Sequence, residues 1–242
     1  MFPDINCDMG EGMAYDGLIM PFIDAASIAC GFHAGNSDTI KKTIDLALEH
    51  QVKIGAHPSF RDKENFGRRE MKLPHDRVYA IVIEQLIKVD LIAKEKGARL
   101  HHMKPHGALY NMAAKDRGLA QTLATVVKDF DEKLVVYGLS GSYLVTEAEA
   151  LGLKVAHEAF ADRTYFDDGS LVPRKQPDAV IDSKEQMIHQ VNQLVKNGTV
   201  TTVSGKTIAV KADTICIHSD TRHAWQYAKA LRELKAQIEA GT

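Results

Sequence analysis

Short apolar segments alternate with longer amphipathic segments along most of the chain. The apolar segments span residues 2–8, 25–30, 52–56, 99–103, 134–139, 154–159 and 214–217, and their lengths are typical of β-strands. The segment 134–139 is almost continuously apolar, as expected of a parallel strand that is buried on both faces. Because most of these segments are followed by a helical pattern, the sequence predicts a parallel sheet of about seven strands.

Apolar residues three and four positions apart predict the helices between the strands. Helices are expected after a cap at Asn36 or Ser37, over residues 75–97, from 111 to about 128, over 142–151, from Ser183 and from about Thr221. Ser183 and Gln186 have the spacing of a capping box, in which two side chains satisfy free backbone N–H groups. Residues 199–203 and 207–210 alternate around a short turn, which predicts a hairpin.

Ionisable and amide side chains recur where the predicted strands end. In an open sheet such groups concentrate on two or three strand ends, next to the switch point where the ligand binds. Here they follow nearly every strand, as they do in a barrel whose strand ends face one central pocket. We therefore predict an α/β fold with a distorted, seven-stranded TIM-like barrel that forms a single domain over residues 1–242. The residues expected to line its pocket are Asn6, Asp8, His33, His57, Lys104, His106, Glu158, His218 and Asp220.

Lys104 follows the strand that Pro105 and Gly107 end. A surface turn is the simplest interpretation of such a segment, but a charge beside a buried strand needs a partner, because an unpaired buried ammonium is costly. Asp8, Glu11 and Glu158 are the available carboxylates. If Lys104 polarises a substrate oxygen, its replacement by methionine is expected to leave the fold intact and to lower turnover.

Composition restricts the partners of the chain. Its 242 residues include 30 basic and 32 acidic side chains, for a formal charge of −2. The chain therefore lacks the net positive charge that favours binding to nucleic acid or to an anionic membrane. A small polar ligand is the expected partner. The three cysteines lie in apolar segments without Cys-x-x-Cys spacing, so they are interpreted as core thiols of a cytoplasmic protein. The pattern of the first residues predicts no signal peptide, and no apolar run reaches the ~18 residues that span a bilayer.

The polar residues at the strand ends suggest roles in acid–base chemistry and in anion binding. Carboxylates inside a closed pocket can exchange protons near neutral pH, and Asp8, Glu11 and Glu158 are the candidates. Arginines in the loops can bind a carboxylate or phosphate in bidentate fashion, or they can be ordinary surface charges. The candidates are Arg163, Arg174 and either Arg68 or Arg69. The charged loop over residues 60–73 is interpreted either as a lid or as a solvated loop.

A metal site is an open alternative for the histidines. Asp8, His33 and His57, with His218, could hold zinc or manganese, since neutral imidazoles and a carboxylate suit these ions. The same histidines could instead orient a substrate by hydrogen bonds. No nucleotide motif is present, because the Ser-Gly-Lys-Thr segment at 204–207 lies between two short strands and not between a strand and a helix.

Six segments together resemble the LamB/YcsF family, which is identified with the A subunit of ATP-dependent 5-oxoprolinase. They are Asn6-Cys7-Asp8-Met9-Gly10-Glu11, Ala29-Cys30-Gly31-Phe32-His33-Ala34-Gly35, Gly55-Ala56-His57-Pro58-Ser59 with Phe66-Gly67-Arg68-Arg69, Lys104-Pro105-His106-Gly107-Ala108-Leu109-Tyr110, Glu158-Ala159-Phe160-Ala161-Asp162-Arg163, and Ile215-Cys216-Ile217-His218. The chain departs from the family pattern at Asn36, where aspartate is frequent, and at Ser219, where glycine is usual.

The resemblance implies cleavage of 5-oxo-L-proline to L-glutamate, coupled to hydrolysis of ATP to ADP and phosphate. It implies ATP with Mg²⁺ as cofactor, which another chain of the assembly could hold, and two further subunits, B and C. The expected catalytic residues are Asp8, Glu11, His57, Lys104, His106 and Glu158. The expected substrate-binding residues are Asn6, His33, Arg68, Arg163, Arg174, His218 and Asp220. Two alternatives remain at this point: a metal-dependent carbohydrate or N-acyl deacetylase on a related barrel, and a non-catalytic ligand-binding subunit.

Overall fold

The computed structural model of the chain describes residues 2–221 and 223–241. Its elements follow one another as β1 (Asp4–Met9), α1 (Asp16–Ile19), the 3₁₀ helix η1 (Met20–Phe22), β2 (Ala25–Ala29), α2 (Ser37–Glu49), β3 (Lys53–His57), α3 (His75–Glu95), β4 (His102–Met103), α4 (Gly107–Lys115), α5 (Arg117–Asp131), β5 (Val135–Leu139), α6 (Tyr143–Ala150), β6 (Lys154–Phe160), α7 (Lys184–Asn197), β7 (Thr199–Thr201), β8 (Thr207–Ala209), β9 (Thr214–Ile217) and α8 (Ala224–Ala240).

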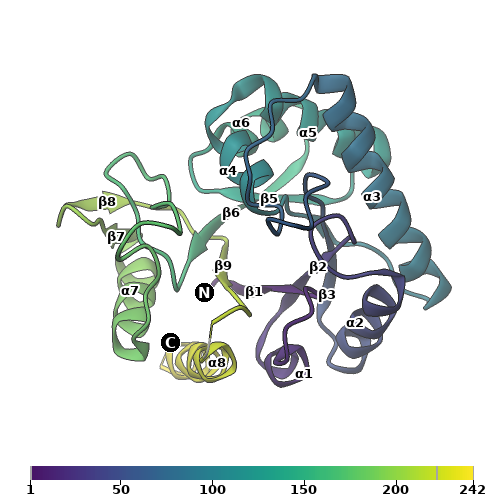
Figure 1. Cartoon of the computed structure of the whole chain (residues 1–242). Helices are drawn as coiled ribbons and strands as arrows, with labels where there is room; N and C mark the ends of the chain where they lie inside the picture. Colours follow the sequence, from purple (N-terminus) through teal and green to yellow (C-terminus); the bar gives the residue numbers. More distant parts are fainter. Residues whose placement is uncertain (1, 222, 242) are drawn as a thin grey trace.

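Within the described residues, seven parallel strands close into a barrel in the order β1-β2-β3-β4-β5-β6-β9. The ring is completed by β9, which pairs with both β6 and β1. Along β1, Asn6 lies opposite Ala25 of β2 and Cys216 of β9. Helices surround the ring, with α2 and α3 on one side, α5 and α6 on another, and α7 and α8 on the side of the C-terminus (Figure 1). The predicted α/β barrel of seven strands is confirmed, and the hairpin predicted near residue 204 is the separate sheet of β7 and β8.

The longest helix, α3, shows how the sequence pattern produces the core. Val78, Val82, Leu86 and Val89 share one face of the helix, and at most 1% of the surface of each is exposed. Burial of such a side chain contributes about 1.5–3 kcal/mol to folding. This stripe belongs to a single large cluster that also contains the apolar side chains of the barrel strands, such as Ile5. The helices are therefore held around the barrel mainly by apolar contact.

Several predicted boundaries differ from the structure. The helix expected from 111 to 128 is two helices, α4 and α5, because the Asp116 carboxylate accepts the backbone N–H of Leu119 and starts a new helix. The last helix begins at Ala224 and not near 221, and the short elements α1 and η1 were not predicted. Ladder pairing in β4 is confined to His102 and Met103 of the expected strand 99–103. None of these differences changes the order of the barrel strands.

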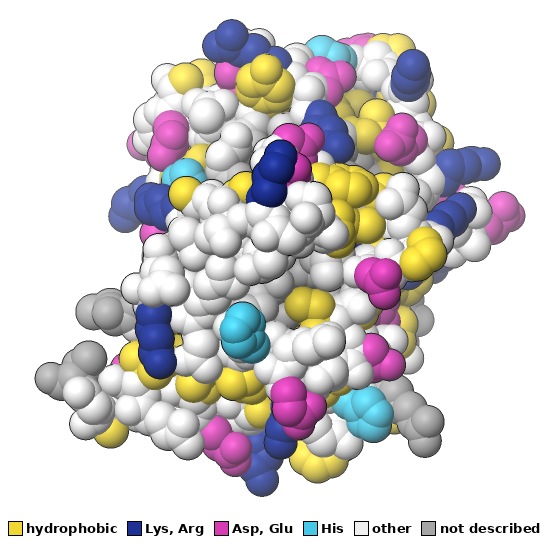
Figure 2. All heavy atoms as spheres, turned by 90° about the vertical axis from the view of Figure 1, so that its left-hand side faces the viewer, with side chains coloured by type: hydrophobic (Ala, Val, Ile, Leu, Met, Phe, Trp, Pro, Cys, Tyr) yellow, Lys and Arg dark blue, Asp and Glu magenta, His cyan; other side chains and the backbone are white. Residues whose placement is uncertain are grey.

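The face that carries α7 and the β7–β8 hairpin has basic and acidic side chains interspersed, and neither sign gathers into a patch there (Figure 2). No helix in the part of the chain that the structure describes is both long enough and apolar enough to cross a membrane.

Candidate functional site

A pocket of about 370 Å³ lies at the end of the barrel where the parallel strands have their carboxyl ends. Nine of the sequence-predicted site residues line it: Asp8, Glu11, His57, Arg68, Lys104, His106, Arg163, Arg174 and His218. Four others contact this lining without belonging to it. Asn6, His33 and Glu158 are buried behind it, and Asp220 bonds the two arginines of the rim. Of the nine residues predicted to line one pocket, five do so, Asp8, His57, Lys104, His106 and His218, and the other four lie beside or behind the lining.

Lys104 lies in the wall of the pocket and is only 2% exposed. Its ammonium nitrogen Nζ is 2.9 Å from Oδ1 of Asp8 and 2.7 Å from Oε1 of Glu158. It also donates a hydrogen bond to Oδ1 of Asn6 at 3.0 Å. Burial alone would lower the pKa of Lys104, but these carboxylates raise it well above its usual value. The expected carboxylate partners are therefore present, in Asp8 and Glu158.

Glu158 lies behind the pocket lining, where it contacts Lys104. Its surface is completely buried, and it accepts hydrogen bonds from Nδ2 of Asn6 at 2.9 Å and from the Tyr110 hydroxyl at 2.7 Å. Asn6 also donates to the Thr214 hydroxyl at 2.8 Å. Each carboxylate oxygen of Glu158 is thus engaged by the protein. The geometry suits a counter-ion that fixes Lys104 and Asp8, and not a group that reaches a bound substrate.

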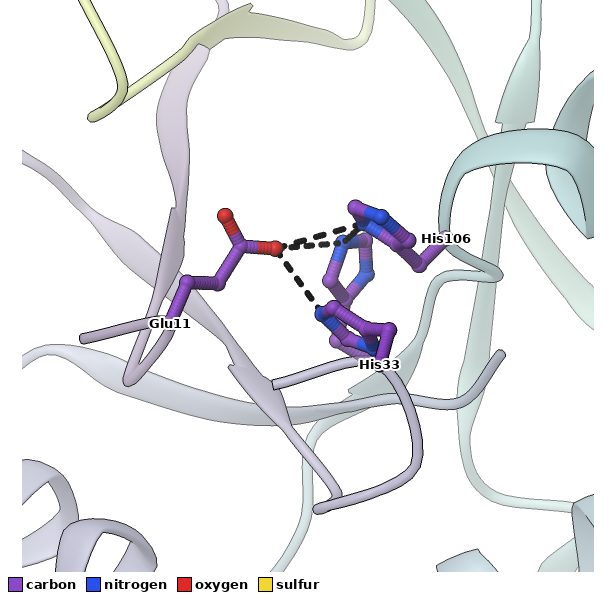
Figure 3. Close-up of side chains that lie close together, drawn as sticks. Glu11, His33 and His106 are labelled. Atoms are coloured by element: carbon purple, nitrogen blue, oxygen red, sulfur yellow. Dashed lines mark hydrogen bonds and ion pairs between the residues drawn. The ribbon is translucent and has the colours of Figure 1, made fainter. Parts of the chain in front are cut away.

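Three histidines and Glu11 form a compact cluster beside this network. Oε1 of Glu11 is 3.0 Å from Nε2 of His33, 3.3 Å from Nδ1 of His106 and 3.9 Å from Nε2 of His57. Figure 3 shows the carboxylate directed at His33 and His106, which come from different loops. Nδ1 of His106 is 2.9 Å from Nε2 of His57, and the rings of His33 and His106 stack at 3.8 Å. We refer to Glu11, His33, His57 and His106 as the histidine cluster.

The loop between β3 and α3 holds two of these rings in place. Ser59 contacts Nδ1 of His33 at 2.9 Å, and the carbonyl oxygen of Phe66 accepts a hydrogen bond from Nε2 of His106 at 2.9 Å. Gly67 has a φ of +65°, and a Cβ there would approach both His33 and His106 to 2.9 Å. The loop was expected to be either a lid or solvated. Its central part is instead packed against the cluster and orients two of its histidines.

The surroundings shift the pKa values of Asp8 and Glu11, two carboxylates that line the pocket, in opposite directions. Burial alone would raise the pKa of Asp8, but His57 and Lys104 beside it lower that pKa well below its usual value. Burial and then the charge of Asp8 raise the pKa of Glu11 well above its usual value. Burial also lowers the pKa of His33 to about 2, and it lowers the pKa of His106 well below its usual value. These surroundings favour the ionised form of Asp8 and the protonated form of Glu11.

Cationic side chains form the rim of the pocket. Arg68 and Arg174 each donate to the same oxygen of Asp220, Oδ2, at 2.7 Å. One carboxylate therefore faces two guanidinium groups, which leaves a net positive charge at the mouth. Arg163 differs from them, because it is 5% exposed and donates to the carbonyl oxygens of Val172 and Ala179. Those bonds hold the loop after β6 and leave Arg163 less free to bind a substrate.

Some residues of the site were not predicted from the sequence. Asp162 bonds Nδ1 of His218 at 2.9 Å and also accepts the backbone N–H of His218. Burial alone would raise the pKa of Asp162, but His218 lowers it to about 2. Cys216, expected to be a core thiol, is buried, and its sulfur lies 3.1 Å from Nζ of Lys104. Tyr110 lies in the first turn of α4, and its hydroxyl donates to Oε2 of Glu158 at 2.7 Å.

The two departures from the family pattern have structural roles. Asn36 caps α2 by accepting the backbone N–H of Thr39 at 2.9 Å, which settles the choice between Asn36 and Ser37. Ser219 is 2% exposed and donates its hydroxyl to the carbonyl oxygen of Asp8 at 3.0 Å. The serine therefore ties the segment after β9 to the end of β1.

A closed α/β barrel with charged and imidazole side chains gathered at the strand ends defines the class of barrels that bind small molecules at this end. Within that class the chain belongs to the LamB/YcsF family, which matches residues 3–240.

The 5-oxoprolinase A subunit of Bordetella pertussis is 48% identical over 234 residues, which are 95% of this chain and 93% of that protein. The protein of the same name from Histophilus somni is 49% identical and covers 96% of this chain and 94% of its own length. The crystal structure of a lactam utilization protein from Thermus thermophilus has 40% identity and a TM-score of 0.91, and it covers 99% of this chain and 98% of its own.

Proposed function

We propose that the chain is the A subunit of an ATP-dependent 5-oxoprolinase, which converts 5-oxo-L-proline and water to L-glutamate while ATP becomes ADP and phosphate. The observation that carries the proposal is the nearly full-length similarity to proteins named as the A subunit of 5-oxoprolinase, at 46–49% identity. The site supports it, because the pocket combines cations at its mouth with an apolar wall that includes Leu139, Phe160 and Leu171. These features suit a small ring that bears a carboxylate.

In the proposed reaction the pocket binds the substrate through its carboxylate and activates water. Arg68 and Arg174, which share Asp220, offer guanidinium groups to the carboxylate of 5-oxoproline. Asp8 lies 3.3 Å from Nε2 of His57, and the two side chains together are the candidates for accepting the proton of the attacking water. Because a five-membered lactam is stable, phosphorylation of its oxygen by ATP would make the ring carbon open to attack. Stabilising charge on that oxygen is then the main catalytic task.

The chain is expected to work only with partners, and we propose that these are the two other 5-oxoprolinase subunits, B and C. The word "subunit" in the names of its relatives indicates an assembly, and the sequence contains no recognisable nucleotide motif. ATP and Mg²⁺ would therefore be held at least partly by the partners.

The purified chain alone should form no glutamate from 5-oxoproline and ATP, whereas addition of the two partners should produce glutamate and ADP together. Glutamate, ADP and phosphate would be quantified in each mixture, with the partners alone as the control. ATP-dependent turnover by the isolated chain would contradict the assignment to an assembly. Full turnover by the partners without this chain would contradict the proposed function itself.

A further inference from the structure

We propose that the histidine cluster, Glu11, His33, His57 and His106, is a binding site for one divalent transition-metal ion, with zinc the best match. One carboxylate oxygen and three ring nitrogens, contributed by four separate segments of the chain, all lie within 4.8 Å of one another. All four residues are buried. The ligand set differs from the one that the sequence suggested, because Asp8 contacts His57 but does not belong to this group of four.

The hydrogen bonds on the outer side of each ring fix which nitrogen carries its proton. Nδ1 of His57 faces the carbonyl oxygen of Lys104 at 2.8 Å, and Nε2 of His106 faces that of Phe66 at 2.9 Å. A carbonyl oxygen only accepts, so each of these nitrogens must be an N–H donor. The inner nitrogens, Nε2 of His57 and Nδ1 of His106, therefore present lone pairs in the neutral rings.

His33 follows the same rule through a hydroxyl group. The Ser59 hydroxyl donates its hydrogen to the carbonyl oxygen of Phe60 at 2.9 Å, so it can only accept from Nδ1 of His33. Nε2 of His33 is then also a lone pair directed at Glu11. Three lone pairs and a carboxylate thus converge on one small buried volume.

The inner nitrogens of His57 and His106 are 2.9 Å apart. Two lone pairs at this distance repel one another unless a positively charged atom lies between them. Protons could supply this charge, but one is needed between His57 and His106 and another between His33 and Glu11. A single dication replaces both. It also satisfies all four groups at once, which a proton cannot do because it bridges only two.

The distances within the cluster match the requirements of a metal ion. Ligands bound at 2.0–2.2 Å in a tetrahedral site lie roughly 3.4 Å apart. Four of the six separations between ligand atoms of the cluster are 2.9, 3.0, 3.3 and 3.9 Å, which bracket this value, and all six are within 4.8 Å. Three imidazoles and one carboxylate suit zinc and its neighbours, whereas Mg²⁺ prefers oxygen ligands and water. Outer bonds from carbonyl and hydroxyl oxygens are also the usual way in which metal-binding histidines are oriented.

The ion would lie at the wall of the pocket, since Glu11, His57 and His106 line it. There it could polarise the oxygen of a bound carbonyl group, a role that rests on the proposed function. The metal site itself does not rest on that proposal, because binding of zinc can be measured without any turnover.

The test uses the full-length chain, stripped with a chelator and titrated with zinc chloride. Bound zinc is measured by elemental analysis after dialysis, affinity by calorimetry, and folding by melting temperature and circular dichroism. The variants are Glu11→Gln, His106→Ala and Ser59→Ala, with Asp8→Asn to distinguish the two ligand sets. His189→Ala is the matched control, because His189 is an exposed histidine on α7, away from the site.

We expect about one zinc per wild-type chain, a higher melting temperature with zinc than without it, and no effect of magnesium chloride at the same concentration. His189→Ala and Asp8→Asn should keep this stoichiometry. Ser59→Ala should bind zinc about 10–100-fold more weakly, as loss of a ligand-orienting partner does. Glu11→Gln and His106→Ala should lose stoichiometric binding of zinc while circular dichroism shows a folded chain.

Absence of stoichiometric zinc on the wild-type chain would overturn the proposal. Unchanged affinity in the folded Glu11→Gln and His106→Ala chains would overturn it as well.

Discussion

Lys104 pairs with two carboxylates that are almost completely buried, Asp8 and Glu158. The sequence alone suggested a catalytic cation that could be removed without harm to the fold. In the structure, removal of the ammonium would leave two like charges in a site of low polarity, and a buried charge that loses its partner costs about 3–5 kcal/mol. The residue therefore has a structural task in addition to any part in turnover.

We expect Lys104→Met to lower the free energy of unfolding by about 3–5 kcal/mol. The double variant Lys104→Met/Glu158→Gln should recover part of this loss, because the glutamine removes one of the two unpaired charges. Denaturant unfolding of both variants and the wild type is the measurement, and Lys229→Met, on the exposed side of α8, is the control with an expected change under about 0.5 kcal/mol. A single variant as stable as the wild type would show that Lys104 is not a structural ion-pair partner.

The side chains that face the pocket could be predicted because each follows an apolar strand, and parallel strand ends meet at one end of a barrel. The carboxylate partners of Lys104 were among the three that the sequence suggested, but its other contacts could not be predicted in this way. Lys104 contacts Asn6 and Cys216, which are neighbours only through the register of β1 on β9. Asp162 was missed because its contact with His218 joins the ends of two strands that lie far apart in the sequence.

The start of α2 illustrates how an element depends on one polar side chain. Asn36 accepts the backbone N–H of Thr39 and so satisfies one of the free donors of the first turn. Asn36→Ala should lower the free energy of unfolding by about 1 kcal/mol, whereas Asn36→Asp should change it by less than about 0.5 kcal/mol, since aspartate caps a helix equally well. Chemical denaturation of the two variants tests this. Equal losses in both would show that the cap does not stabilise α2.

Asp24 connects α8 to the other end of the barrel. Its carboxylate accepts the backbone N–H of Ile5 and pairs with Arg232 and Lys235 of α8 at 2.9 Å. Burial alone would raise the pKa of Asp24, but these partners lower it below its usual value. As the pH falls below about 4, the unfolded chain takes up a proton at this position before the folded chain does, so the stabilisation is present above that pH and is lost below it.

The difference in unfolding free energy between the wild type and Asp24→Asn should therefore be largest near neutral pH and should shrink between about pH 5 and pH 3. Denaturant unfolding at a series of pH values measures it. A difference that stays constant over this range would mean that the ionised carboxylate does not hold α8.

The apolar periodicity predicted most of the helices and their order, but it did not predict all of their boundaries. Residues 107–131 keep a helical pattern throughout, and the break at Asp116 depends on a cap whose geometry appears only in the folded chain. The ladder of β4 is short for a similar reason. Its length is set by which residues find partners on β3 and β5, and not by its own composition.

At the scale of the whole molecule, the closed barrel brings groups from the start, middle and end of the chain to one pocket. Asp8 is the last residue but one of β1, His57 ends β3 and His218 follows β9, and all three line the same cavity. The recurrence of polar residues at strand ends predicted this convergence. The histidine cluster as a set of four could not be predicted, because it also depends on the fold of the loop that places Ser59 and Phe66 behind its rings.

Whether this pocket cleaves 5-oxoproline is tested most sharply by ATP-dependent glutamate formation in the reconstituted assembly carrying Asp8→Asn. Lys104 keeps Glu158 as a partner in this variant, so the chain should remain folded, as melting temperature and circular dichroism would show. We predict a fall in turnover of about 10²-fold or more, as expected for loss of a general base. Turnover equal to that of the wild type would contradict the proposed function of the pocket, since a pocket that only binds a ligand has no need of that carboxylate as a base.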